Sequence, residues 1–167
     1  MGRHLVTAHQ ANFLPYLGFF EKILVSDAFV LVDDTQFVKR GAFGWIHRNR
    51  ILGSGDEPLW LTVPVVTHGR YEQKILEVEI DNARDWRRKH WRSIVFAYRH
   101  APYFKELGPG LEAIYAKEWG KLFDLSQSVI AWVLEILKVS MPVSLASSLE
   151  IGGSGSGYVL ELARKSG

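Results

Sequence analysis

A strand–helix–strand pattern near the start of the chain most constrains its fold. Residues 4–8 predict a first strand, residues 17–25 carry apolar side chains at helical spacing, and the unbroken apolar run at residues 28–32 is typical of a buried parallel strand. Crossovers of this kind are nearly always right-handed. We therefore predict an α/β fold with three layers, a mainly parallel sheet and a helical C-terminal portion.

The rest of the chain predicts a loop, two further strands and then mostly helices. The expected elements are a loop over residues 39–51, strands at 59–66, 75–80 and 143–146, and helices at 86–100, 111–119, 122–139 and 158–165. Asp85 stands where it could cap the helix that follows. We expect Trp86, Trp91 and Tyr98 on that helix to be core residues.

Composition narrows the classes of function. The chain has 167 residues, which suits a single domain spanning residues 1–167, and it contains no cysteine, which excludes disulfides and thiolate metal sites. A formal net charge of only +2 argues against a nucleic-acid partner. No segment is long enough to span a membrane and none is typical of a signal peptide, so we expect a cytoplasmic protein.

Polar side chains gather where the first predicted strand ends. His9, Gln10 and Asn12 lie at the junction with the first helix, the crevice in which open α/β sheets bind ligands. We predict that His9 and Gln10 are catalytic and stabilise developing charge, and that Asn12 contacts the substrate. The alternative is a structural histidine that caps the turn.

An acidic pair follows the second predicted strand, at the same edge of the sheet. Asp33 and Asp34 could hold Mg²⁺ together with substrate phosphates, or Asp34 could act as a catalytic base. They could equally cap the following turn. Adjacent residues of an extended chain point to opposite sides, so we expect one of the two to face the crevice. Gln36 is a further candidate for substrate binding.

The predicted loop is both basic and aromatic, and we expect it to cover the crevice. Its candidate substrate-binding residues are Lys39, Arg40, Trp45, Arg48, Asn49 and Arg50. Arginine and lysine side chains bind phosphates or carboxylates, an asparagine amide can bind a sugar hydroxyl, and an indole can stack on a base or a sugar. A solvated loop is the alternative. Lys89 and His90 could face the crevice or simply lie on a helix surface.

Several of these motifs, in this order, resemble the WbqC-like protein family. The matching segments are His-Gln-x-Asn-Phe-Leu-Pro-x-Leu-Gly-x-Phe-x-Lys-Ile (9–23), Asp-Asp-x-Gln-Phe-x-Lys-Arg (33–40), Trp-Ile-x-Arg-Asn-Arg-Ile (45–51), Trp-Leu-Thr-Val-Pro (60–64), Trp-x-x-Lys-His (86–90) and Tyr-x-x-Ala-Pro-Tyr-Phe (98–104). The resemblance covers nearly the whole chain. It departs at Ala11, where the family usually has proline, and at the C-terminus, where members usually continue beyond a helix like that at residues 158–165.

The resemblance implies a transferase of O-antigen or other surface polysaccharide biosynthesis, acting on a small anionic or nucleotide-activated substrate. The first strand and helix are also similar to those of nucleotidylyltransferases with a His-x-Gly-His motif, in which imidazoles hold phosphates. His9 matches the first imidazole, whereas Phe19 and Phe20 follow Gly18 where the second would stand. A non-catalytic nucleotide- or sugar-binding protein, lacking the family's C-terminal segment, is the alternative.

Overall fold

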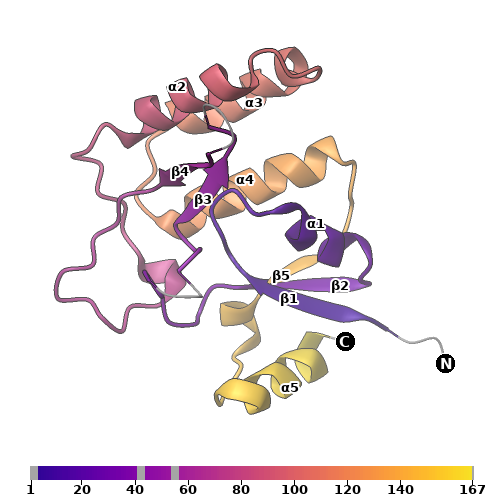
Figure 1. The fold of residues 1–167 in the computed structure, drawn as a ribbon. Helices are drawn as coiled ribbons and strands as arrows, with labels where there is room; N and C mark the ends of the chain where they lie inside the picture. The colour runs from indigo at the N-terminus through magenta and orange to yellow at the C-terminus, as the bar shows by residue number, and fades with distance from the viewer. Residues whose placement is uncertain (1–3, 41–43, 54–56, 167) are drawn as a thin grey trace.

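A three-stranded parallel sheet forms the centre of the N-terminal half of the fold (Figure 1). The computed structural model describes residues 4–40, 44–53 and 57–166. In the sheet, β2 (Ala28–Val32) lies between β1 (Val6–Gln10) and β5 (Val143–Leu145). Gln10 pairs with Val32, so β1 and β2 end at the same edge. The mixed α/β fold class with a parallel sheet is therefore confirmed.

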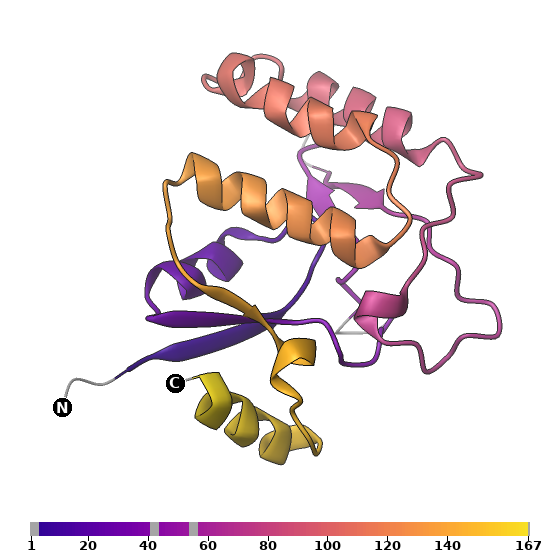
Figure 2. The ribbon, with the colours of Figure 1, turned by 180° about the vertical axis from the view of Figure 1, so that it is seen from behind.

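Helices cover both faces of this sheet, as the figures show from opposite sides (Figures 1 and 2). Phe29 and Leu31 of β2 face the main core together with α1 (Leu17–Leu24) and α4 (Leu122–Ile136). Val30 and Val32 face the other way, in a smaller cluster with Leu162 of α5 (Gly155–Ser166). The alternation follows from the two-residue period of a strand, and a strand buried on both faces needs the continuous apolar run seen in the sequence.

A second unit stands beside the sheet. It contains the antiparallel hairpin of β3 (Arg48–Ile51) and β4 (Leu59–Thr62), with α2 (Trp86–Tyr98) and α3 (Phe104–Ala116) beyond it and η1 (Ile75–Glu77) packed against α4. After β5, η2 (Ala146–Leu149) connects the sheet to α5. Buried residues of the hairpin, the helices and α1 belong to one continuous core, so both units pack as one body.

Three predictions in the strand region were wrong. The predicted loop at residues 39–51 ends in β3, because Arg48 to Ile51 pair with residues 59–62; residues 41–43 of that loop lie outside the described residues. The predicted strand at 75–80 begins instead as η1. Ile75 and Val78 are both fully buried, a spacing that suits a helix with three residues per turn, and Glu77 caps the backbone N–H of Lys74. The predicted strand at 59–66 ends at Thr62, before Pro64.

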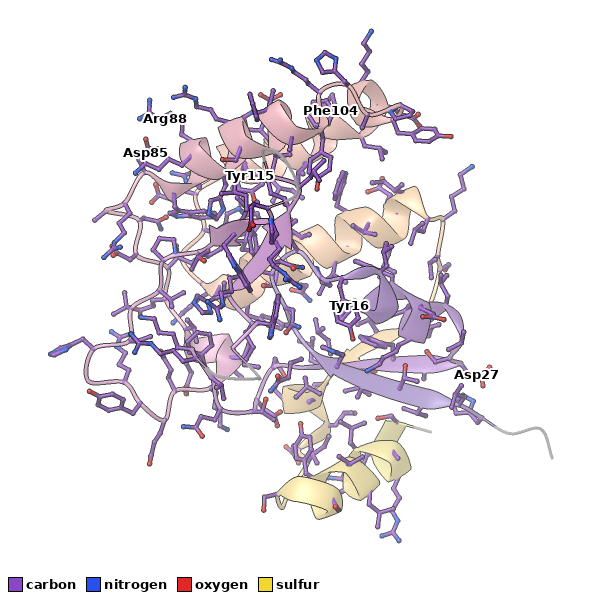
Figure 3. All side chains as sticks on the ribbon, in the orientation of Figure 1. Tyr16, Asp27, Asp85, Arg88, Phe104 and Tyr115 are labelled. Atoms are coloured by element: carbon purple, nitrogen blue, oxygen red, sulfur yellow. The ribbon has the colours of Figure 1, made fainter. Side chains whose placement is uncertain are left out.

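The helical predictions need two corrections. α3 begins at Phe104 rather than 111 and runs through Pro109; Gly108 packs against the Phe104 ring and Gly110 against Trp132 of α4. Asp85 stands at the N-cap of α2 but makes no capping bond, since its carboxylate pairs with Arg88 (Figure 3).

The three predicted core residues of α2 differ in burial. Trp86 is buried, whereas Trp91 and Tyr98 are only half-buried, at the edge of the core. Their polar atoms explain this position, because the Trp91 indole donates to Glu112 and the Tyr98 hydroxyl accepts from the Leu52 N–H.

Candidate functional site

His9 and Gln10 end β1 on opposite faces of the sheet. His9 lies on the α1 side, where its ring meets Phe19 edge-on at 5.1 Å and Tyr16 at 6.2 Å between centroids. Tyr16 stands just before α1 and is 53% exposed (Figure 3). Gln10 points the other way, and its amide donates a 3.0 Å hydrogen bond to the Thr35 hydroxyl. The two predicted catalytic side chains therefore leave β1 on opposite faces of the sheet.

The His9 imidazole is held in one tautomer. Its Nδ1 lies 3.0 Å from the backbone oxygen of Gln10, which can only accept, so Nδ1 carries the proton and Nε2 carries a lone pair. Burial lowers the pKa of His9, and the charge of Lys22 lowers it further against the raising effect of the Gln10 carbonyl. A neutral imidazole with an unprotonated Nε2 is suited to accept a proton.

A pocket of about 510 Å³ lies beside this imidazole. It is lined by His9, Gln10, Asn12, Phe13, Pro15, Tyr16, Trp45, Arg48, Asn49 and Arg50. Asn49 is fixed because its amide donates to the backbone oxygen of Leu14. The side-chain oxygen of Asn12, in contrast, is buried without a hydrogen-bond partner in the described part of the chain. A buried acceptor of this kind is a ready contact for a ligand donor.

Arg48, Arg50 and Trp45 line one side of the pocket, and Trp60 stacks against them from behind. The rings of Trp45 and Trp60 lie 4.8 Å apart, the Arg48 guanidinium lies 4.5 Å from the centre of the Trp60 ring, and that of Arg50 lies 5.1 Å from Trp45. The hairpin register explains this cluster: Arg50 pairs with Trp60, and these residues share the face opposite to buried Leu61. Positive charge and flat aromatic surface are thus presented together.

Asp33 and Asp34 do not line this pocket. Asp33 is 2% exposed, and its carboxylate accepts hydrogen bonds from the Ser147 backbone at 2.9 Å and from the Ser147 hydroxyl at 2.6 Å. Asp34 accepts a 2.6 Å hydrogen bond from the Tyr158 hydroxyl. Asp33 thus bonds the first turn of η2, which is not the turn that follows it in the sequence. In the described residues, no three acidic or histidine side chains are grouped as metal ligands.

Three other predicted residues also lie elsewhere. The Gln36 amide donates to the backbone oxygen of Tyr71, and the Lys39 ammonium donates to the Thr67 hydroxyl beside a different cavity. Arg40 is exposed and does not line the pocket. The structure therefore brings His9, Gln10, Asn12, Trp45, Arg48, Asn49 and Arg50 together and separates Asp33, Asp34, Gln36, Lys39 and Arg40 from them.

Sequence reasoning missed Trp60, Phe13 and Tyr16 as parts of this site. Trp60 could have been found from the hairpin, because pairing residues 48–51 with 59–62 places it opposite Arg50. For Phe13 and Tyr16 the only signal was their position between His9 and α1.

No described helix is long and apolar enough to pass through a lipid bilayer.

Comparisons with known proteins give one family and one relative. It is 42% identical over 109 residues to an uncharacterized protein of Mycobacterium tuberculosis. The aligned residues are 65% of this chain and 45% of that protein, so they span less than half of the relative's length. No solved structure gives a significant match. The model of the WbqC-like protein family matches residues 10–167, from the end of β1 onward, and the chain therefore belongs to that family.

Proposed function

We propose that the pocket beside His9 binds a nucleotide- or phosphate-activated small substrate, and that the protein is a cytoplasmic transferase of surface polysaccharide biosynthesis. The observation that carries the proposal is that two guanidinium groups and the Trp45 indole line a pocket that also holds a neutral imidazole, with Trp60 stacked against Trp45 and Arg48. Arginine binds phosphate through two parallel N–H donors, and an indole can stack on a base or a sugar ring.

Each group has a part in this proposal. Arg48 and Arg50 bind the phosphates, Trp45 contacts the ring, and the unpartnered Asn12 oxygen accepts from a sugar hydroxyl or base N–H. His9 Nε2 takes the proton from the acceptor hydroxyl or amine while its oxygen or nitrogen bonds to the transferred group. The bond from that group to the phosphate breaks, and the phosphate leaves with the bonding electrons, held by the arginines.

Gln10 and Asp34 take different parts from those expected of catalytic residues. The amide of Gln10 ties the end of β1 to Thr35, so we propose that it positions His9 through the backbone carbonyl that the imidazole contacts. Asp34 is assigned to anchoring α5 through Tyr158. Because Asp33 and Asp34 are both hydrogen-bonded to the C-terminal segment, neither is placed as a catalytic base. This favours the second candidate, a nucleotide-binding protein without catalysis.

Thermal unfolding with nucleoside diphosphates and nucleotide sugars tests the proposal. A ligand at one hundred times its Kd should raise the free energy of unfolding by about 2.7 kcal/mol. Arg50→Ala should weaken that stabilisation, whereas Arg164→Ala, which removes an exposed arginine of α5, should not. Product formation in the same mixtures, followed by mass spectrometry, separates a transferase from a binding protein. Stabilisation by no nucleotide, or equal stabilisation of the Arg50 variant, contradicts the proposed site.

A further inference from the structure

A second cavity of about 360 Å³ lies between β4, the start of α2 and the chain that follows β2. It shares no lining residue with the pocket beside His9. Its wall includes His47 and Thr62 from the hairpin, His90 from α2, and the side chains of Lys39 and Lys89. With Arg84, the lining holds five basic side chains, beside the carboxylates of Asp81 and Asp85.

The two histidines in this wall are buried and incompletely bonded. His47 is 3% exposed and His90 is 7% exposed, and in the described residues the Nδ1 atom of each has no hydrogen-bond partner. Burial lowers the pKa of each to about 4, so both rings are neutral near pH 7. Aromatic neighbours contact them, Phe37 for His47 and Trp86 for His90. The His90 ring also bonds the backbone of Thr62, which accounts for an imidazole at that position. Among the described residues, His47 has no such bond, so packing against Phe37 does not explain why it is an imidazole.

The lining carries a net positive charge, because Lys39, Arg84 and Lys89 outnumber the carboxylates of Asp81 and Asp85, and both carboxylates are already paired with arginines. Asp81 pairs with Arg84 at 3.2 Å, and Asp85 pairs with Arg88. Lys39 donates only to the Thr67 hydroxyl, and Lys89 has no ion-pair partner among the described residues. Two ammonium groups therefore remain at the cavity without a compensating carboxylate, and neutral imidazoles lie in its wall.

We propose that this cavity is a second ligand site, which binds a phosphate monoester through Lys39, Lys89 and His47, with the His90 ring beside them in the wall. The ammonium groups supply compact positive charge to the phosphate oxygens. The His47 Nδ1–H adds a directed donor that water cannot replace at a buried position. A volume near 360 Å³ lies at the small end of ligand pockets, which suits a sugar phosphate and not a whole nucleotide sugar.

Calorimetric titration tests this site with glucose 1-phosphate and inorganic phosphate, at constant ionic strength in chloride. Lys39→Ala and Lys89→Ala should each weaken binding about tenfold, since each removes a charged hydrogen bond worth about 1.4 kcal/mol. Lys105→Ala, an exposed lysine of α3, is the matched control and should bind as the wild type does. Tighter binding of the ester than of inorganic phosphate supports the ester as ligand. Equal binding overturns that part of the proposal.

Histidine side-chain NMR shows where the phosphate binds even if a variant fails to fold. During the titration of the wild-type protein, the ring resonances of His47 and His90 should shift, whereas those of exposed His68 should not. Arg50→Ala should leave these shifts unchanged, which keeps this test separate from that of the nucleotide pocket. Phosphate binding that is lost in the Arg50 variant, or that leaves both buried rings unmoved, overturns the proposal.

Discussion

The Tyr158 hydroxyl of α5 donates a 2.6 Å hydrogen bond to the Asp34 carboxylate at the end of β2. The two residues are 124 positions apart in the sequence. Burial raises the pKa of Tyr158, and its hydrogen bond to Asp34 raises it further, so the phenol keeps its proton at neutral pH. Together with the bonds from Ser147 to Asp33, this contact joins the C-terminal segment to the edge of the sheet.

We expect Tyr158→Phe to lower the free energy of unfolding by about 1 to 2 kcal/mol. The change removes a hydrogen bond to a charged group that is partly screened by solvent, and it keeps the aromatic ring. Urea denaturation followed by circular dichroism measures the loss. Tyr103→Phe, at a residue 69% exposed, is the control and should change stability little. Equal stability of the two variants would mean that Asp34 contributes nothing to holding α5.

Asp33→Ala should lower the free energy of unfolding more than Tyr158→Phe does, because it leaves both donors of Ser147 without their acceptor. Its carboxylate is buried and accepts from the backbone and the hydroxyl of that residue. We expect a loss of about 2 to 3 kcal/mol in urea denaturation. Asp33→Asn keeps one acceptor oxygen and should cost less. If instead Asp33→Asn abolishes transfer without loss of stability, Asp33 is a functional carboxylate and the capping assignment is wrong.

Local patterns predicted the first half of the sheet well. The apolar run at residues 28–32 coincides with β2, because a strand covered on both faces needs apolar side chains at every position. The rule that ligands bind beyond strand ends led to His9 and Asn12, which do line the pocket. Both inferences depend on residues close together in sequence, whose geometry the backbone itself fixes.

The partners of the acidic pair could not be predicted in the same way. The sequence showed that Asp33 and Asp34 stand at the right edge, but their donors, Ser147 and Tyr158, come from elements more than one hundred residues later. Which groups occupy a strand end depends on how the chain returns to the sheet. The position of Lys39 could not be predicted for the same reason. It lines a different cavity from Arg48 and Arg50, although it is close to them in the sequence.

The buried histidines make stability depend on pH. Their pKa values, lowered to about 4 mainly by burial, lie below the value of 6.5 expected in the unfolded chain. The unfolded state therefore binds more protons as the pH falls below 6.5, and the stability present above that value is lost progressively toward pH 4. Between pH 7.5 and pH 5 we expect a loss of about 2 kcal/mol for each histidine.

Urea denaturation of the wild type and of His90→Gln across this range measures that loss. The variant lacks the His90 ring, so between pH 7.5 and pH 5 its stability should fall by about 2 kcal/mol less than that of the wild type. Identical slopes would show that His90 is not kept neutral by the fold. Comparing slopes rather than absolute stabilities removes the contribution of carboxylates that begin to titrate near pH 5.

The tautomer of His9 leads to a kinetic prediction for the proposed transferase. In His9→Asn, the asparagine amide can still donate to the Gln10 carbonyl, whereas the Nε2 lone pair is lost. We expect kcat to fall by about 10² to 10⁴, the usual worth of a general base, with KM for the activated donor little changed. For the wild type, kcat/KM should decrease as the pH falls through the pKa of His9, which burial holds below 6.5. His9→Ala should lose kcat to the same extent but also lose stability, because the Gln10 carbonyl then has no donor. A variant that raises KM and leaves kcat intact would show that His9 binds substrate without taking its proton.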